Sequence, residues 1–283
     1  MKKYHPSTPS RRHMTTIPFK KYLTVSEPHK ALTHGMKRDM GRNAFGRITV
    51  RHKGGGAKKL YREIDFRYEK KDIPATIMTI EYDPFRTGFI ALVNYADGAK
   101  RYVLVPKGVK VGDKFIVSET AEATVGNRLP LKKIPVGTFV YNIEINPNSG
   151  SKLVRSAGSF GQVIANDAGY THIKMPSTEI RKVNENSWAT IGTVSNDENR
   201  LVNIGKAGRS RWLGIRPTVR GTAQNPVDHP HGGGEGRQGR GLRRAKSRWG
   251  KPTGKGQKTR TPKKYSNVFI VSRRRVGKQK SDK

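Results

Sequence analysis

The segment from Gly221 to Lys264 most constrains how this chain can fold. Prolines aside, its only apolar side chains larger than alanine are Val227, Leu242 and Trp249. Three such side chains bury too little surface to offset the conformational entropy lost when the segment becomes ordered. We therefore expect that another molecule holds this segment in shape.

Glycines and arginines indicate what kind of molecule that is. Gly232, Gly233 and Gly234 lie in the middle of a stretch that begins at Arg220 and ends at Arg240. Residues without a Cβ let backbone N–H groups approach a ligand closely, and they adopt positive φ. One guanidinium group can donate two parallel hydrogen bonds to the oxygens of a phosphate. We interpret residues 220–240 as a loop that penetrates folded RNA.

The distribution of charge supports a polyanionic partner. The chain carries 57 Lys and Arg against 21 Asp and Glu, a formal net charge of +36, and only 33% of it is hydrophobic. Residues 1–60 hold 15 basic and 2 acidic side chains, residues 61–200 hold 19 and 16, and residues 201–283 hold 23 and 3. A nearly neutral body between two cationic arms is typical of proteins whose tails bind nucleic acid.

Other partners and compartments are disfavoured. The chain has no run of about 18 apolar residues, so we expect no membrane partner. Met1-Lys2-Lys3 is basic, but no apolar stretch follows, which argues against a secretory signal. Cysteine is absent, which excludes disulfides and thiolate metal sites and is compatible with the reducing cytosol.

Residues 61–128 alternate in polarity and are rich in β-branched and aromatic side chains, a pattern typical of strands. The Asp-Gly pair at 97–98 predicts a hairpin, because both positions tolerate positive φ. Five short strands favour a small barrel, and we choose the oligonucleotide-binding (OB) type. Periodicity alone fits other small barrels equally well. The expected strands are 61–67, 76–82, 89–95, 100–106 and 114–118.

Residues 129–204 form a second strand-rich region, with Gly, Pro, Asn or Asp turns between most segments. We expect a second small barrel of the SH3-like type. Trp188 lies beside Ala189 and Ile191 in one strand, so we assign it to the core rather than to an RNA-stacking surface. The expected strands are 138–145, 152–156, 162–166, 170–175, 180–183 and 188–194.

The two ends of the chain are predicted to be long, irregular, basic extensions. Residues 1–60 show no helical or strand period. We expect this arm to contact phosphates and to order on RNA, with a flexible tail as the alternative. Residues 205–283 form the other extension, with one strand expected at 266–272. The predicted architecture is thus all-β, with two barrels between the extensions.

A short helix is expected within residues 205–217, ending before Pro217. Arg209, Arg211 and Arg216 would then surround Trp212. Guanidinium groups near an indole stack on it and on bases, which suits an RNA surface. The alternative is that Trp212 packs against the second barrel.

An enzyme-like cluster lies inside the glycine-rich stretch. Asp228, His229, His231 and Glu235 offer two imidazoles and two carboxylates that can ligate a divalent metal, or His229 can act as a general base. No helix fixes these ligands and no apolar pocket is evident, so we favour hydrogen bonds to RNA and to the loop's own backbone. Residues 234–239 match G-x-G-x-x-G but lack the strand and apolar helix of a dinucleotide site.

The stretch Asn225-Pro226-Val227-Asp228-His229-Pro230-His231-Gly232-Gly233-Gly234-Glu235-Gly236-Arg237 resembles the signature of the large-subunit ribosomal protein family called L-two, in its bacterial form. Segments at 9–12, 46–56, 80–84, 205–209 and 211–214 extend the resemblance over nearly the whole chain. Some positions depart from the family: Gln224 replaces the usual Met, and Ala57 and Tyr141 each replace a common His. Residues 241–248 also differ from the commoner sequence.

The resemblance implies an OB barrel followed by an SH3-like barrel, a position in the cytoplasmic ribosome near the peptidyl-transferase centre, and contacts with small-subunit rRNA at a subunit bridge. Neighbouring ribosomal proteins are expected partners, but a homo-oligomer is not. We expect no catalytic residue, no metal site and no cofactor apart from Mg²⁺ that accompanies rRNA. His229 matches the family's histidine discussed in peptide-bond formation, and for it we carry over proximity rather than chemistry.

Residues and resemblance together predict a set of RNA-binding side chains and glycines. Two rival functions remain open, an enzyme that uses His229 for acyl transfer or metal-dependent hydrolysis and a DNA-packing protein. The predicted set is Arg11, Arg12, Arg42, Arg47, Arg51, His52, Lys53, Lys206, Arg209, Arg211, Trp212, Arg216, Arg220, Asn225, Asp228, His229, His231, Gly232, Gly233, Gly234, Arg237, Arg240, Arg243, Arg244, Arg248, Arg273, Arg274 and Arg275.

Overall fold

The structure is a computed structural model that describes residues 1–38, 40–234, 239–254 and 259–274. The chain divides into two compact units. The first comprises Met1–Lys37, Lys58–Lys206 and Ser266–Lys283, and the second comprises Arg38–Ala57 and Ala207–Tyr265. The predicted N-terminal extension of residues 1–60 is therefore shared between the two units rather than forming one arm.

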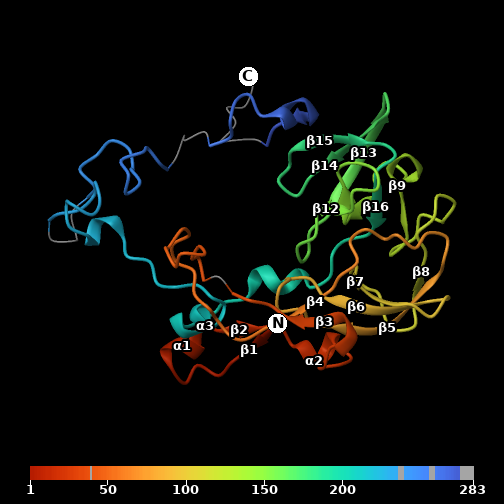
Figure 1. The fold of residues 1–283 in the computed structure, drawn as a ribbon, viewed down its shortest axis with the longest axis horizontal. Helices are drawn as coiled ribbons and strands as arrows, with labels where there is room; N and C mark the ends of the chain where they lie inside the picture. The colour runs from red at the N-terminus through yellow and green to blue at the C-terminus, as the bar shows by residue number, and fades with distance from the viewer. Residues whose placement is uncertain (39, 235–238, 255–258, 275–283) are drawn as a thin grey trace. The chain divides into compact units, whose positions relative to one another are not determined.

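The first sheet of the first unit is antiparallel and has the order β7-β6-β5-β8 (Figure 1). It contains β5 (Ala75–Glu81), β6 (Ile90–Tyr95), β7 (Lys100–Leu104) and β8 (Lys114–Phe115), which match four of the five strands expected in this region. The fifth is shorter than expected: β4 covers Leu60–Arg62 and pairs with β3 (Thr33–Gly35). Alternating side chains of β5, β6 and β7 fill the core beneath this sheet.

The hairpin between β6 and β7 is confirmed, but its turn differs from the expected type. The Gly98 N–H donates to the Tyr95 carbonyl at 2.9 Å, and Gly98 has φ of +81°. Asp97 instead keeps a negative φ, and its carboxylate accepts the Ala99 N–H at 3.1 Å. The loop is therefore a three-residue turn that needs one glycine rather than two positions with positive φ.

The second sheet has the order β17-β15-β14-β13-β10-β16-β9 and is also antiparallel. The bounds of its strands, and of a separate β11–β12 pair, are β9 (Arg128–Pro130), β10 (Phe139–Tyr141), β11 (Ile143–Glu144), β12 (Ser151–Leu153), β13 (Gly161–Asp167), β14 (Tyr170–Lys174), β15 (Ile180–Asn184), β16 (Trp188–Ile191) and β17 (Ile270–Ser272). The two curled sheets confirm the predicted all-β class (Figure 1).

Two expected strands are interrupted. The strand predicted at 138–145 breaks into β10 and β11 at Asn142, which has φ of +55°. The last strand, predicted at 266–272, begins instead as the 3-10 helix η5 (Tyr265–Phe269), and only β17 pairs with β15.

Buried charge and an aromatic side chain connect the two sheets. Arg128 and Glu144 are each 1% exposed and form an ion pair at 3.0 Å. The Arg128 guanidinium lies 4.6 Å from the ring of Tyr68, which precedes the first sheet. Trp188 of β16 is 5% exposed and belongs to the core of the first sheet, which confirms its assignment to the core.

The remaining elements are short. They are β1 (Lys2–Lys3), β2 (Thr15–Thr16), α1 (Pro9–Arg12), α2 (Phe19–Tyr22), α3 (Ala207–Trp212), and the 3-10 helices η1 (Lys30–Leu32), η2 (Leu131–Lys133), η3 (Asp197–Leu201) and η4 (Gly221–Ala223). Within the described residues, no helix combines the length and apolarity that a bilayer crossing requires.

Candidate nucleic-acid interface

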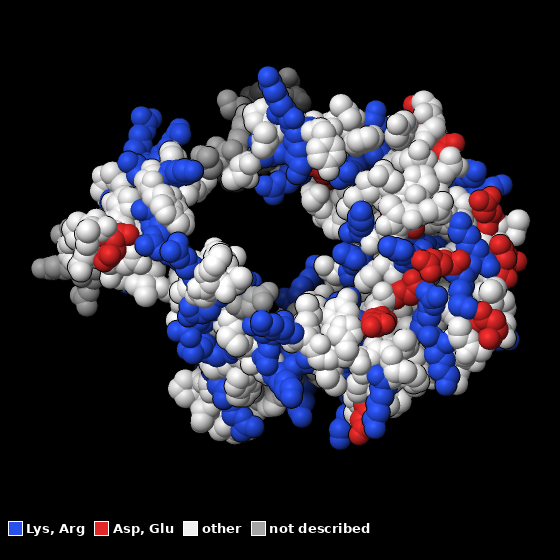
Figure 2. All heavy atoms as spheres, viewed as in Figure 1, with Lys and Arg blue, Asp and Glu red and all other residues white. Residues whose placement is uncertain are grey.

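Positive charge is concentrated in the second unit, whose two ranges hold 21 Lys and Arg against 3 Asp and Glu. Its large apolar side chains include Phe45, 89% exposed, and Val227, 91% exposed. On the face drawn in Figure 2, most acidic side chains lie over the sheets of the first unit, whereas Lys and Arg occur throughout. The second unit therefore offers a surface that an anionic partner can cover.

Residues 40–57 form a loop that is closed by its own backbone. Arg42 and Ile48 form an antiparallel β-bridge, and the Asn43 N–H donates to the Arg47 carbonyl at 3.0 Å. The Arg38 guanidinium donates to the carbonyls of Gly56 and Ala57, both at 2.9 Å. Since backbone carbonyls satisfy Arg38, this cation has a structural role, whereas Arg47 carries its charge on an exposed turn.

The loop pairs with the segment that follows α3. The Gly54 N–H donates to the Gly214 carbonyl at 2.8 Å, and the Arg216 N–H donates to the His52 carbonyl at 3.1 Å. A Cβ at Gly56 would lie 2.6 Å from the Trp212 carbonyl oxygen, so this close approach requires glycine. The pairing brings two parts of the predicted RNA-binding set, 51–53 and 211–216, onto one surface.

Trp212 lies on this surface and is 58% exposed. Its backbone carbonyl accepts the N–H of Ala57 at 2.8 Å. More than half of the residue is thus exposed, and its role at an RNA surface stays a prediction. Ala57, where the resembled family often has His, contributes its backbone rather than its side chain to this pairing.

The glycine loop, residues 220–234, closes on itself through backbone hydrogen bonds. The Gly233 N–H donates to the Gln224 carbonyl at 3.1 Å, and the Asp228 N–H donates to the Asn225 carbonyl at 3.0 Å. A Cβ at Gly232 would lie 2.2 Å from the Asn225 carbonyl oxygen, an impossible contact. This glycine is therefore needed for the loop's own packing, a role that the sequence analysis, which considered close approach to a ligand and positive φ, did not include.

The two histidines of the loop act as acceptors toward the backbone. His229 Nδ1 accepts the His231 N–H at 3.0 Å, and His231 Nε2 accepts the Lys246 N–H at 2.9 Å. Desolvation, the neighbouring His229 and nearby cations hold the pKa of His231 below its usual value, which keeps this ring neutral and able to accept. The first of these contacts is a hydrogen bond to the loop's own backbone, as predicted, whereas the second reaches the backbone of Lys246 outside the loop.

A catalytic or metal-binding role for this cluster gains no geometric support. His229 Nδ1 and His231 Nε2 each already accept a backbone N–H, and Asp228 is exposed. Glu235, the fourth member, lies outside the described residues. Across the described part of the chain, His, Asp and Glu side chains form no group of three or more that fits a metal ion.

Sequence reasoning missed Trp249, which lies at the tip of a short hairpin, residues 245–253. The Ser247 N–H donates to the Lys251 carbonyl at 2.8 Å, and the Gly250 N–H donates to the Ser247 carbonyl at 2.9 Å. Trp249 is 71% exposed, with the guanidinium groups of Arg51 and Arg248 at 5.5 and 5.6 Å from its ring. The signal that could have found it is an aromatic residue before a turn glycine among arginines.

The predicted RNA-binding residues do not form one cluster. Those in the second unit, from Arg42 to Lys53 and from Arg209 to Arg248, lie on the surfaces described above or on exposed segments beside them. Arg11 and Arg12 of α1, together with Lys206, Arg273 and Arg274, belong to the first unit. Arg273 is partly neutralised by Glu179 at 3.7 Å. Arg237 and Arg275 lie outside the described residues.

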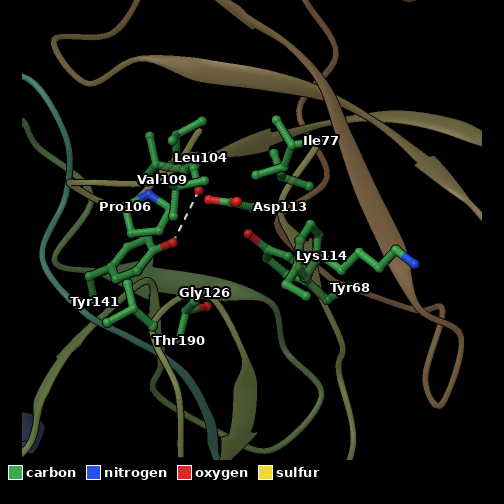
Figure 3. Close-up of a pocket in the computed structure, with 14 residues that line it drawn as sticks. Tyr68, Ile77, Leu104, Pro106, Val109, Asp113, Lys114, Gly126, Tyr141 and Thr190 are labelled. Carbon is green, nitrogen blue, oxygen red and sulfur yellow. Dashed lines mark hydrogen bonds between the residues drawn. The ribbon is translucent and has the colours of Figure 1, made fainter. Parts of the chain in front are cut away.

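A cavity of about 210 Å³ lies between the two sheets of the first unit (Figure 3). Its polar groups serve the fold: the Tyr141 hydroxyl donates to the Leu104 carbonyl at 3.2 Å, and the Tyr68 hydroxyl accepts from Asn142 at 2.9 Å. Burial raises the pKa of Tyr68 to about 12 and that of Tyr141 well above its ordinary value. Both phenols stay protonated at neutral pH, so neither can act as a base.

Two protein-family models match the chain. The model described as Ribosomal Proteins L2, RNA binding N-terminal domain, matches residues 29–118. The model described as Ribosomal Proteins L2, C-terminal domain, matches residues 124–250. The first range contains the first sheet and the loop 40–57, and the second contains the second sheet through β16, the glycine loop and Trp249.

Proposed function

Because the chain belongs to the ribosomal protein L2 family, we propose that its exposed cationic loops insert between rRNA helices while the two barrels fix their positions. The chain is a structural, rRNA-binding component of the large ribosomal subunit. Its first sheet forms the OB-like barrel and its second sheet the SH3-like barrel of this family. The family is structural rather than a class of enzymes.

The observation that carries the proposal is the contrast between the two units. The first contains the buried apolar cores of both sheets and is close to charge balance in residues 61–200. The second holds 21 cations against 3 carboxylates and leaves rings such as Trp212 and Trp249 exposed. Cations neutralise phosphates, exposed rings stack on unpaired bases, and glycines let the backbone approach.

The location within the ribosome is the finer part of the proposal. We place the glycine loop near the peptidyl-transferase centre and the protein at a bridge to small-subunit rRNA in the cytoplasmic ribosome. The match to the family signature at 225–237 supports this placement. His229 would contribute to loop geometry through its bond to the His231 N–H rather than to chemistry. Mg²⁺ would enter with the rRNA rather than as a protein-held cofactor.

The central test is the salt dependence of binding between the full chain and a large-subunit rRNA fragment. With about 8 phosphate contacts, the logarithm of the affinity should fall with the logarithm of salt concentration with a slope of about −6. Amide exchange in residues 221–264 should be slowed by the rRNA, and exchange in the barrels should change little. A flat salt response would refute the proposal.

Two comparisons separate the rival functions. A DNA-packing protein would bind duplex DNA and structured rRNA with equal affinity, whereas the glycine loop suits deep insertion into folded RNA. An enzyme would show turnover without RNA and lose that turnover in His229→Ala. We expect weaker binding to duplex DNA and no turnover.

A further inference from the structure

The cavity between the two sheets of the first unit has the chemistry of a small-molecule site. Its apolar walls include Ile77, Val103 and Phe115, which belong to the core of the first sheet. Tyr141 of β10 and Thr190 of β16 line it from the second sheet. Its volume of about 210 Å³ exceeds the roughly 150 Å³ of an apolar protein cavity that binds benzene.

The cavity communicates with solvent. Val125 and Asp113 both line it, Val125 is 54% exposed, and Asp113 is exposed as well. A Cβ at Gly192 would lie 3.2 Å from Val125 and 3.9 Å from the Tyr141 ring, so this mouth residue and a wall residue lie close to the same backbone position. A small molecule can therefore reach the apolar walls from outside while both sheets stay folded.

The polar groups at the cavity accept hydrogen bonds. The Tyr141 hydroxyl donates to the Leu104 carbonyl at 3.2 Å, which leaves its lone pairs for a second partner. Burial raises the pKa of Tyr141 well above its usual value, so the hydroxyl stays neutral. The Asp113 carboxylate and the Tyr141 hydroxyl both point into the space between the lining residues, whereas the Lys114 ammonium points away from it (Figure 3).

The fold holds Asp113 at the mouth. Its Oδ2 accepts the Lys110 N–H at 2.8 Å, and its backbone carbonyl accepts the Ile77 N–H at 2.9 Å. Within the described residues, its Oδ1 accepts no hydrogen bond. A ligand that supplies an N–H or O–H beside the apolar walls would therefore form a charge-assisted hydrogen bond with this oxygen.

Charge and shape narrow the class of ligand. An anion, such as a phosphate of RNA, would meet the carboxylate of Asp113 at the mouth. A cation would be repelled by Lys110 and Lys114, which flank Asp113 in the sequence. A neutral, flat aromatic molecule with one N–H or O–H donor fits the volume, the apolar walls and the acceptors together.

We propose that this cavity binds a small neutral aromatic molecule of the indole or phenol class, with its ring against the apolar walls and its N–H or O–H donated to Asp113. The inference goes beyond the proposed rRNA-binding function and does not depend on it. Because residues of both sheets line the cavity, a bound ligand would contact both and stabilise the folded first unit.

The test is calorimetric titration of the full chain with indole and with benzofuran. The two molecules have the same bicyclic shape, but benzofuran carries an oxygen where indole carries its N–H. Indole should bind roughly tenfold more tightly, because it alone can donate to the Asp113 carboxylate. At about ten times its Kd, indole should raise the Tm of the first unit by about 4 °C.

Two variants with matched controls locate the site. Val125→Phe places a large ring at the mouth and should weaken indole binding roughly tenfold, whereas Val136→Phe, at a 62% exposed valine outside the lining, should not. Asp113→Asn keeps an oxygen for the Lys110 N–H but turns a donor toward the ligand. It should lower the affinity for indole roughly tenfold and that for benzofuran less than twofold. Asp167→Asn, at another exposed carboxylate, is its control.

Three results would overturn the inference: neither heat of binding nor a rise in Tm with indole, equal affinities for indole and benzofuran, or equal losses in Val125→Phe and Val136→Phe. Thermal unfolding of each variant without ligand checks that it is folded, and the comparison of indole with benzofuran needs no variant. Indole is uncharged, so its binding should not depend on salt. A negative result here leaves the salt-dependent rRNA binding of the proposed function intact.

Discussion

Replacing Arg128 with Met should strongly destabilise the first unit. The guanidinium donates to the Asn142 carbonyl at 2.8 Å, to Thr190 Oγ1 at 3.2 Å and to Glu144 Oε1 at 3.0 Å. A fourth, longer contact reaches the Trp188 carbonyl at 3.4 Å. Burial lowers the pKa of Arg128, while the carboxylate of Glu144 opposes that effect. Met replaces the aliphatic stem of Arg128 but supplies no hydrogen-bond donor.

The expected cost is about 3–5 kcal/mol, because the substitution leaves the Glu144 carboxylate buried without a counter-charge. The carboxylate keeps two backbone donors, Asn148 N–H at 3.0 Å and Trp188 N–H at 3.4 Å, so we place the cost near the lower end of this range. For a unit of this size, a loss of about 3 kcal/mol lowers Tm by roughly 10 °C. Urea unfolding, monitored by the fluorescence of Trp188, measures the loss in the free energy of unfolding.

The double change Arg128→Met with Glu144→Leu is the internal control. Removing both charges leaves no unpaired carboxylate, so the double variant should recover most of the stability that the single variant loses. Two results would refute the reasoning. One is a cost below about 1 kcal/mol for Arg128→Met, and the other is a double variant whose cost equals the sum of its single changes.

Three further outcomes are expected in the second unit. Gly232→Ala should weaken amide protection in the glycine loop, because the new Cβ would meet the Asn225 carbonyl oxygen at 2.2 Å. The folded-state pKa of His231 is lowered, so the loop's stability is complete above about pH 6.5 and is lost as pH falls through that lowered pKa. The exchange protection of the Lys246 amide, followed from about pH 8 to 5, measures this loss. Trp249→Ala should reduce the affinity for single-stranded RNA roughly tenfold by fluorescence titration, with little effect on duplex RNA.

Much of the fold could be predicted because strands leave a local signal. Alternating polarity placed β5, β6 and β7 within about two residues, and the Asp97–Gly98 pair placed their hairpin. The break at Asn142 could not be predicted, since its cause is tertiary. The Asn142 side chain donates to the Tyr68 hydroxyl, and its carbonyl accepts from Arg128. Tyr68 is remote in sequence, and Arg128 belongs to another strand, β9.

The candidate site was predictable in composition but not in assembly. Counts of Arg, Gly and His identified the glycine loop and both basic arms. The pairing of residues 52–57 with 212–216 depends on backbone hydrogen bonds, which have no periodic sequence signal. Likewise, the contacts among rings and cations of residues 59–66, 85–86 and 155 join segments that only the folded sheets bring together.

The two units keep their shapes for different physical reasons, and this difference underlies our expectation that the second unit contacts RNA. In the first unit, buried side chains such as Leu131 and Ile173 are withdrawn from water, so the fold is stabilised by the hydrophobic effect. In the second unit, backbone hydrogen bonds and glycine-only close approaches define the geometry, and such bonds contribute little net stability in water. Many of its cations and rings, among them Arg47 and Trp249, are consequently exposed. Phosphates and bases that cover them would remove water from these bonds and neutralise the repulsion among the cations, so RNA binding and the folding of this unit should be thermodynamically coupled.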